Sequence, residues 1–209
     1  MIITIFGATG MVGKQLVKIA LHKGHTVKAF GRNVYTSSLG EHENLQIIQG
    51  ALFDEAQVLR AISGSEAVVS ALGGASDGTD KTRSLGMKNI VAQMEKAGIT
   101  RIIAVGSKGV LNDENGDLIL ESPSYPRHFI PVGTEHFKAL EYLQNSSLDW
   151  TFVAPPDIMD AEATGHYTTA PDTVPAQNKD KINAGDLALF MLNELERKAF
   201  VKQKLGISN

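Results

Sequence analysis

The sequence predicts an α/β domain in which helices cover both faces of a parallel sheet of six or seven strands. Short apolar runs rich in β-branched residues alternate along the chain with longer segments of helical period. The first apolar run leads into a turn punctuated by glycines, and a helical segment follows this turn. Right-handed crossovers between successive strands would make the sheet parallel and doubly wound. A chain of 209 residues, of which 43% are hydrophobic and 21% charged, suits one such domain over residues 1–209.

The expected elements follow one another in the order that this fold requires. Strands are expected at residues 1–6, 26–30, 45–48, 67–72, 101–105 and 150–154, with a short last strand within residues 199–207. Helices are expected at residues 11–22, 55–62, 79–97 and 134–145, and from residue 183 onward. We expect Gly24, in a left-handed conformation, to end the first helix and Gly98 to end the third.

Polar residues at the expected helix starts are typical of N-caps. Asp54 and Gln57 have the spacing of a capping box, so we interpret Asp54 as structural, and Asn183 is the expected cap of the last helix. The helix over residues 79–97 is expected to bury an apolar face formed by Leu85, Ile90, Val91 and Met94.

The glycine turn after the first strand has the order strand, glycine turn, helix that binds phosphate groups. We expect Gly7 to permit the tight exit from the strand and Gly13 to let the helix pack closely. Gly10 would let backbone approach a pyrophosphate that a Cβ would exclude. The free N–H groups at Met11 and Val12 would then point at the anion, with the helix dipole behind them. The alternative is an ordinary turn that contains glycine.

Other cofactor contacts are expected at the carboxyl ends of neighbouring strands, where ligands gather in open α/β sheets. Thr9 lies within the glycine turn, and Ala71, Leu72 and Gly73 follow the fourth strand. Their side chains are small or apolar, which suits a close approach to the ribose and pyrophosphate of a dinucleotide.

The tip of the second strand bears on the choice of dinucleotide. An acidic residue about 20 positions beyond the glycine turn is typical of NAD binding. Here no Asp or Glu occupies the tip, and Arg32 does. Since a guanidinium can grip a 2′-phosphate with two hydrogen bonds, the sequence favours NADP (NADPH) over NAD. The alternative is a solvated arginine beside a turn.

Composition excludes several other classes of function. The net charge of −3 gives no electrostatic reason to expect nucleic acid or a membrane surface as partner. Without cysteine there is neither a disulfide nor a thiolate nucleophile, and we expect no metal site. The first apolar run is too short for a signal sequence, and no stretch reaches membrane-spanning length. A cytoplasmic location is therefore expected.

Residues 112–132 and 157–182 lack periodicity, and loops of such length in a compact domain are usually functional or disordered. We expect them to form a small substrate-side region over the nicotinamide end of the cofactor.

The whole chain resembles an atypical short-chain dehydrogenase/reductase of the NAD(P)H-binding, NmrA-like group. The motifs that carry the resemblance are GATGMVG, GRN, VVSALGG, AVGSKGVL, LDWTFVAPPDI, GHYTT and INAGDLALFML. Within the group it is most similar to the biliverdin-IXβ reductase/NADPH-flavin reductases and to bacterial proteins named as NADH-flavin reductases. The resemblance implies a Rossmann-type fold and a cofactor contact at Pro155.

Standard members of this superfamily donate a proton from the Tyr of a Tyr–Lys dyad. Counted along the chain, Val132 stands at the Tyr position and His136 at the Lys position, while Tyr125 and Tyr142 lie out of register. The resemblance therefore implies that the dyad is lost, which argues against an epimerase or dehydratase of sugar nucleotides.

Two candidate catalytic residues remain. Ser107 matches the family's serine, with a plain turn serine as the alternative. His136 matches the helix histidine of the flavin/biliverdin reductases, with a structural histidine as the alternative. Substrate contacts are expected at Lys108, Pro156 and Asp157. Asp157 stands where the resembled enzymes have a histidine, and its charge would disfavour anionic tetrapyrroles.

These observations predict an NAD(P)H-dependent reductase that transfers a hydride to a planar conjugated acceptor, a flavin, a quinone or a tetrapyrrole. Flavin would be a substrate rather than a prosthetic group, because the nicotinamide supplies the chemistry. The alternative is a non-catalytic NADP(H) sensor of NmrA-like type. A monomer or homodimer is expected.

Overall fold

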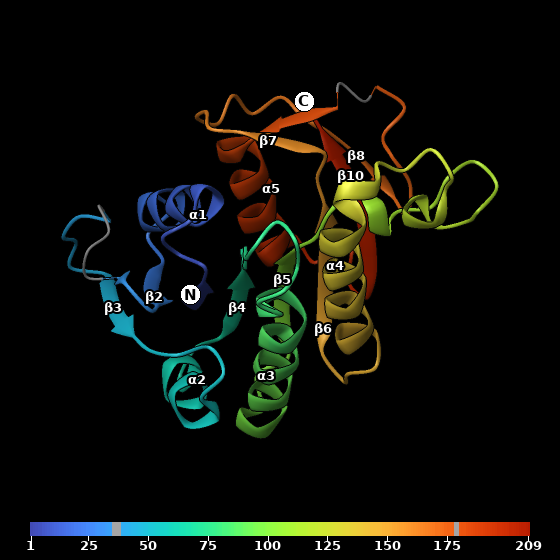
Figure 1. Ribbon diagram of the computed structural model, residues 1–209. Coiled ribbons are helices and arrows are strands. Elements are labelled where there is room, and N and C mark those ends of the chain that lie inside the picture. The colour runs from blue at the N-terminus through green and yellow to red at the C-terminus, as the bar shows by residue number, and fades with distance from the viewer. Residues whose placement is uncertain (35–38, 178–179) are drawn as a thin grey trace.

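The computed structural model describes residues 1–34, 39–177 and 180–209, and these residues form one central sheet between two layers of helices (Figure 1). Eight strands make up the described sheet. In spatial order they are β3 (Leu45–Gln49), β2 (Thr26–Gly31), β1 (Ile2–Phe6), β4 (Ala67–Ser70), β5 (Arg101–Val105), β6 (Asp149–Ala154), β10 (Gln203–Ser208) and β8 (Thr168–Pro171). All neighbours pair in parallel except β10 and β8, which are antiparallel.

Two hydrophobic cores, one on each face, hold the helices to the sheet. The helices α1 (Met11–His22) and α5 (Ala184–Arg197) pack on one face. On the other face lie α2 (Glu55–Ile62), α3 (Thr82–Ala97) and α4 (Ile130–Gln144). In β1, Ile3 and Ile5 belong to the first core and Phe6 to the second. A slip of one residue would exchange the residues between the two faces.

Most expected elements are confirmed, and α1 and β5 have the expected bounds. The described sheet contains eight strands, one more than the six or seven predicted. The additional strand, β8, lies in the segment 157–182, which we expected to be irregular. It pairs with β10 from Leu205↔Pro171 to Ser208↔Thr168. The same segment also contributes β9 (Lys181–Asn183), which pairs with β7 (Asp157–Met159) in a separate two-stranded sheet. Residues 178–179 of this segment lie outside the described residues.

The third and fourth helices differ from expectation. α3 begins at Thr82 rather than at residue 79, and α4 begins at Ile130, with a proline in its first turn, rather than at residue 134. Leu85, expected on the inner face of α3, is 45% exposed. Met87 is buried instead, together with Ile90, Val91 and Met94. These four residues recur at spacings of three, one and three, which keeps them on one helical face and leaves Leu85 on the other.

The helix caps agree in part with the sequence. Asp54 caps α2, since its Oδ1 accepts from the Gln57 backbone N at 2.9 Å. The capping box is not closed, because Gln57 Oε1 accepts from the Ala51 backbone N. Asn183 occupies the N-cap position of α5 without a capping side-chain bond, and its amide donates to Asp186 at 3.2 Å. Gly24 and Gly98 have positive φ angles and follow the ends of α1 and α3, as expected.

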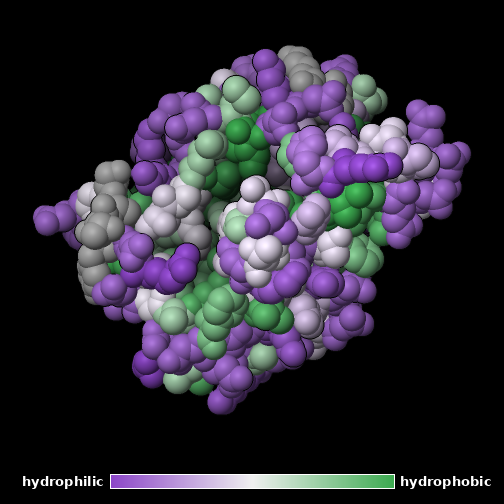
Figure 2. Space-filling model, in the orientation of Figure 1, coloured by the Kyte–Doolittle hydropathy of each residue, from purple (hydrophilic) through white to green (hydrophobic). Residues whose placement is uncertain are grey.

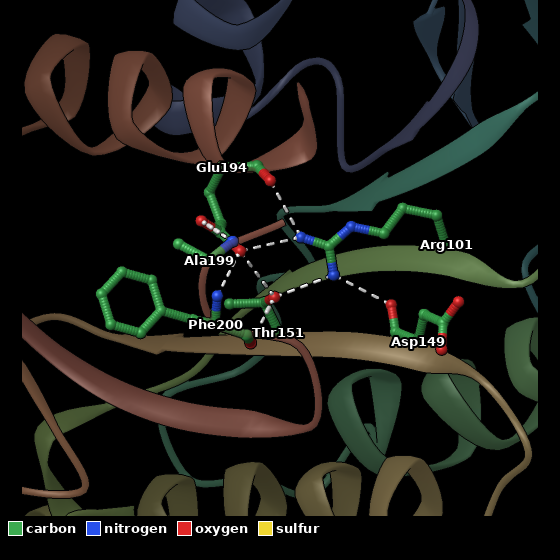
Figure 3. A network of polar contacts seen from close by, with 6 residues as sticks. All are labelled: Arg101, Asp149, Thr151, Glu194, Ala199 and Phe200. Atoms are coloured by element: carbon green, nitrogen blue, oxygen red, sulfur yellow. Dashed lines mark hydrogen bonds and ion pairs between the residues drawn. The ribbon is translucent and has the colours of Figure 1, made fainter. Parts of the chain in front are cut away.

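A buried ion pair fastens the edge of the sheet where the strands begin (Figure 3). Arg101, the first residue of β5, donates from Nη2 to Glu194 Oε1 at 3.1 Å, and both side chains are about 2–3% exposed. The other guanidinium nitrogen, Nη1, donates to the Asp149 carbonyl and to Thr151 Oγ1, both at 2.9 Å. Glu194 also accepts from the Phe200 backbone N at 2.8 Å. The pair thus joins α5 to β5 and β6.

Replacing Glu194 tests this fastening. Glu194→Gln would leave the Arg101 charge buried without its carboxylate partner, so we expect the free energy of unfolding to fall by about 3–5 kcal/mol. Glu196→Gln is the matched control on the same helix, because Glu196 is 44% exposed and its ion pairs are worth about 1 kcal/mol or less. Urea denaturation measures both. Equal, small losses in the two variants would contradict the assignment.

Candidate functional site

Three glycines shape the turn between β1 and α1, and they do so for different reasons. Gly7 has φ +76°, and a Cβ there would lie 2.3 Å from the Ala71 carbonyl oxygen. A Cβ on Gly13 would lie 2.0 Å from the Gly7 carbonyl oxygen. At Gly10 the nearest atom to an added Cβ is the Gly7 oxygen at 3.4 Å, which is ordinary contact. The fold therefore requires glycine at 7 and 13, whereas at 10 it leaves room for a side chain.

The start of α1 is open to an anion. Gly10 is its N-cap, and no described side chain caps the first turn. No acidic residue lies in that turn to compensate the helix dipole. The N–H groups at Met11 and Val12 are thus available to an external acceptor, and a phosphate is the group that such a helix end favours.

A cavity of about 290 Å³, the first cavity, adjoins this turn. It lies where β1, β2 and β4 end. The expected cofactor residues that line it are Gly7, Thr9, Gly10, Arg32, Ala71, Leu72 and Gly73. Met11, Val12 and Gly13 belong to the first turn of α1, beside the cavity. The space-filling view shows hydrophilic residues over most of one face and a hollow with hydrophobic walls near its middle (Figure 2).

The segment after β3 also lines the first cavity, although its residues were not among those predicted from the sequence. It contributes Gly50, Ala51, Leu52 and Phe53. Phe53 is 57% exposed, so its ring is open to a ligand at this edge of the cavity. The available signal was the apolar pair Leu52 and Phe53 just before the capping residue Asp54, of which only Leu52 packs against a core. Such a ring suits stacking on a flat base.

Another cavity, of about 520 Å³, lies where β5 and β6 end, and we call it the second cavity. The predicted residues Ser107, Lys108, Pro155, Pro156 and Asp157 all line it. The segment 112–132 adds Ile119, Ser124, Tyr125, Pro126, Phe129 and Val132, and Asp180 comes from the segment 157–182. The structure thus brings the expected substrate residues together. Pro155, expected at the cofactor, lies in this second cavity and not in the first.

Ser107 lines the second cavity and carries a buried, unused hydroxyl. Its Oγ is buried, and it has no hydrogen-bond partner among residues 1–34, 39–177 and 180–209. A buried polar atom without a partner costs free energy, which a ligand contact would recover. The expectation that Ser107 contacts a ligand stays a prediction, with this orphaned atom in its favour.

Charges at the second cavity are unequal. Lys108 Nζ lies 2.6 Å from Asp180 Oδ1, so these two charges neutralise each other. Asp157 remains, and no described cation forms an ion pair with it. Among the residues that line this cavity the net charge is therefore negative.

His136 lies apart from both cavities. It is buried on α4, and neither cavity has it in its lining. Burial, and to a smaller degree the charge of Arg83, lowers the pKa of His136 to about 3. At neutral pH the imidazole is uncharged, so its surroundings argue against proton donation and favour the structural alternative.

Tyr125, which the sequence register excluded, does line the second cavity. The sequence offered only a weak signal for it, a tyrosine between Pro123 and Pro126 in an aperiodic segment. In the described part of the chain no group of three or more metal-binding side chains occurs. Likewise, no described helix is long and apolar enough to cross a membrane.

Comparison with known proteins agrees with this geometry. Residues 7–198 match the profile of a family described as NAD(P)H-binding. The uncharacterized protein YwnB of Bacillus subtilis (strain 168) is 29% identical over 201 residues, which are 93% of this chain and 92% of that protein.

Solved structures share the fold. One from Streptococcus pneumoniae TIGR4, named "a putative NADH-flavin reductase", is 28% identical with a TM-score of 0.86, covering 100% of this chain and 99% of that chain. A short-chain dehydrogenase/reductase from Veillonella parvula DSM 2008, solved in complex with NADP, is 20% identical with a TM-score of 0.78. The second match covers 100% of this chain and 94% of that chain, and it speaks for the fold alone.

The different roles of the glycines can be tested with two variants. Gly10→Val should abolish dinucleotide binding and leave Tm within a few degrees, because its side chain would enter ligand space. Gly13→Val should lower stability, because its side chain meets backbone. Thermal unfolding and a fluorescence titration with NADPH measure both properties. A folded Gly10→Val protein that still binds NADPH normally would contradict the assignment of this turn.

Proposed function

Because the chain belongs to the NAD(P)H-binding family, we propose that it is an NADPH-dependent reductase whose acceptor is a planar conjugated molecule. The observation that carries the proposal is the space beside Gly10. The fold leaves room there for a Cβ, and the uncapped N-terminus of α1 points into this space. A cavity on the adenosine side and a larger one toward the tips of β5 and β6 lie at the same edge of the sheet.

In this proposal each part of the site binds one part of the dinucleotide. The first cavity takes the adenosine, with Phe53 beside the base. The N–H groups of the first turn of α1 take the pyrophosphate. The nicotinamide reaches the second cavity near Ser107, and the bound cofactor supplies the hydride. The protein binds and orients the two reactants and excludes water between them.

We propose NADPH rather than NADH because Arg32 lines the first cavity at the tip of β2. Arg32 is exposed, and its carbonyl oxygen accepts from Gln49 Nε2 at 2.9 Å, which holds the backbone at this tip. No acidic residue at the tip competes for a ribose hydroxyl. Among the described residues none forms an ion pair with the Arg32 guanidinium, which can therefore pair with a 2′-phosphate.

Arg32→Ala should weaken NADPH binding by about tenfold or more, the loss of a charge-assisted hydrogen bond worth about 1.5–3 kcal/mol. NADH binding should be unchanged. Arg60→Ala, an exposed arginine on α2 that lies outside both cavities, is the control. Fluorescence titration of both nucleotides measures the change. Equal affinities for NADPH and NADH in the unaltered protein would overturn the proposal of NADPH preference.

The lining of the second cavity favours a flat, uncharged acceptor. Its walls carry Phe129, Pro126 and Pro156, apolar surfaces on which a conjugated ring can stack. Asp157, which forms an ion pair with no described cation, disfavours an anionic acceptor by charge repulsion. The structure named as an NADH-flavin reductase supports flavin-like chemistry, and the cavity charge favours riboflavin or a quinone over a phosphorylated flavin.

The test follows NADPH oxidation with riboflavin, FMN, neutral quinones, biliverdin and small aldehydes. Riboflavin and FMN share one ring system and differ by a phosphate, so they form a matched pair. We expect riboflavin to exceed FMN in kcat/KM by about tenfold, the effect of about 1–2 kcal/mol of charge repulsion a few Å away. Asp157→Asn should narrow this ratio. A preference for FMN would contradict the charge argument, and no turnover of any acceptor would contradict the reductase.

A non-catalytic NADP(H) sensor is the second candidate. The observation that favours it is the replacement of the family's Tyr and Lys by Val132 and His136, the second of which is buried and uncharged. The acceptor panel separates the two functions, because a sensor would bind NADPH with no turnover on any acceptor.

A further inference from the structure

The side chain of Tyr125 lies near Val132, the position of the missing family tyrosine. Tyr125 itself comes from the segment before α4. It stands just before a 3₁₀ helix, Arg127–Phe129, that runs directly into α4. Its backbone N donates to the Ser122 carbonyl oxygen at 2.9 Å, and this turn fixes where the side chain starts. The aromatic side chain then lines the second cavity.

Two glycines make room for the end of the tyrosine ring. A Cβ on Gly109, in the 3₁₀ helix Lys108–Val110 after β5, would lie 2.7 Å from the Tyr125 hydroxyl oxygen. A Cβ on Gly133 would lie 3.1 Å from the same oxygen. Gly133 directly follows Val132, where the family's proton-donating tyrosine would stand. The Tyr125 hydroxyl thus lies beside the first turn of α4, next to Val132, where the family's tyrosine is missing.

The hydroxyl is available for chemistry. No described group forms a hydrogen bond with the Tyr125 hydroxyl, which contrasts with the backbone bond of the same residue. Burial raises the pKa of the Tyr125 phenol, so it keeps its proton at neutral pH. Ser107, on the adjoining turn, lines the same cavity, and its buried hydroxyl has no partner among the described residues. Two residues that line one cavity therefore carry hydroxyl groups for which the described part of the chain provides no partner.

We propose that Tyr125 is a catalytic residue that donates a proton to a carbonyl oxygen of a quinone-type acceptor, with Ser107 orienting that acceptor. This inference rests on the proposed reductase function. The acceptor gains the hydride, with its two electrons, from bound NADPH. The phenol O–H bond breaks, a new O–H bond forms at the acceptor oxygen, and water returns a proton to the phenolate. The sum is NADPH, a proton and quinone giving NADP⁺ and hydroquinone.

The experiment compares Tyr125→Phe with the control Tyr142→Phe. Tyr142 also lies at α4, but its ring faces Lys88 at 5.9 Å and lies outside the second cavity. With a neutral benzoquinone as acceptor, Tyr125→Phe should lower kcat by about 10²-fold or more, as expected for a lost general acid. Its NADPH affinity and Tm should not change, and Tyr142→Phe should behave like the unaltered protein.

A second variant displaces the phenol without removing it. Gly109→Ala places a methyl group 2.7 Å from the Tyr125 hydroxyl oxygen, which must then shift, so it should also lower kcat while the protein stays folded. A Tyr125→Phe protein that keeps kcat within a few-fold would overturn the inference and leave the reductase function standing. If the unaltered protein reduces no acceptor, the reductase function and this inference both fall.

Discussion

The turn between β1 and α1 is the constraint on which the rest of the site depends. Backbone atoms meet there so closely that Cβ atoms on Gly7 and Gly13 would lie 2.3 and 2.0 Å from carbonyl oxygens. This contact locks the end of β1 to the end of β4 and fixes the direction of α1. The open helix end follows from it, and so does the space beside Gly10. The Arg101–Glu194 pair fastens the opposite edge of the sheet, where no ligand is expected.

Features that depend on neighbouring residues could be predicted from the sequence. The strand–turn–helix of the glycine motif, the Asp54 cap and the left-handed ends of α1 and α3 all follow from short-range patterns. The family was also predictable, because its motifs extend over the whole chain, as the match to residues 7–198 confirms. The second cavity followed as well, since parallel strands end at one edge of the sheet.

Features that depend on contacts distant in the sequence could not be predicted. Strand β8 forms only because β10 supplies a partner, and its sequence has no strong alternation of its own. His136 was chosen by its position along α4, but burial near Arg83 removes its charge. Tyr125 was rejected by its register, although a folded loop brings its ring to Gly109 and Gly133. The spacing of residues along the chain does not predict which distant residues a folded loop will contact.

A crystal structure of the protein with NADP⁺ tests the central claim most directly. We expect the pyrophosphate on the N–H groups at the start of α1, within contact of Gly10, with adenosine beside Phe53. We expect the nicotinamide ring at the second cavity, near Ser107 and Tyr125. A dinucleotide bound away from the Gly10 turn, or a nicotinamide directed away from the second cavity, would contradict the account.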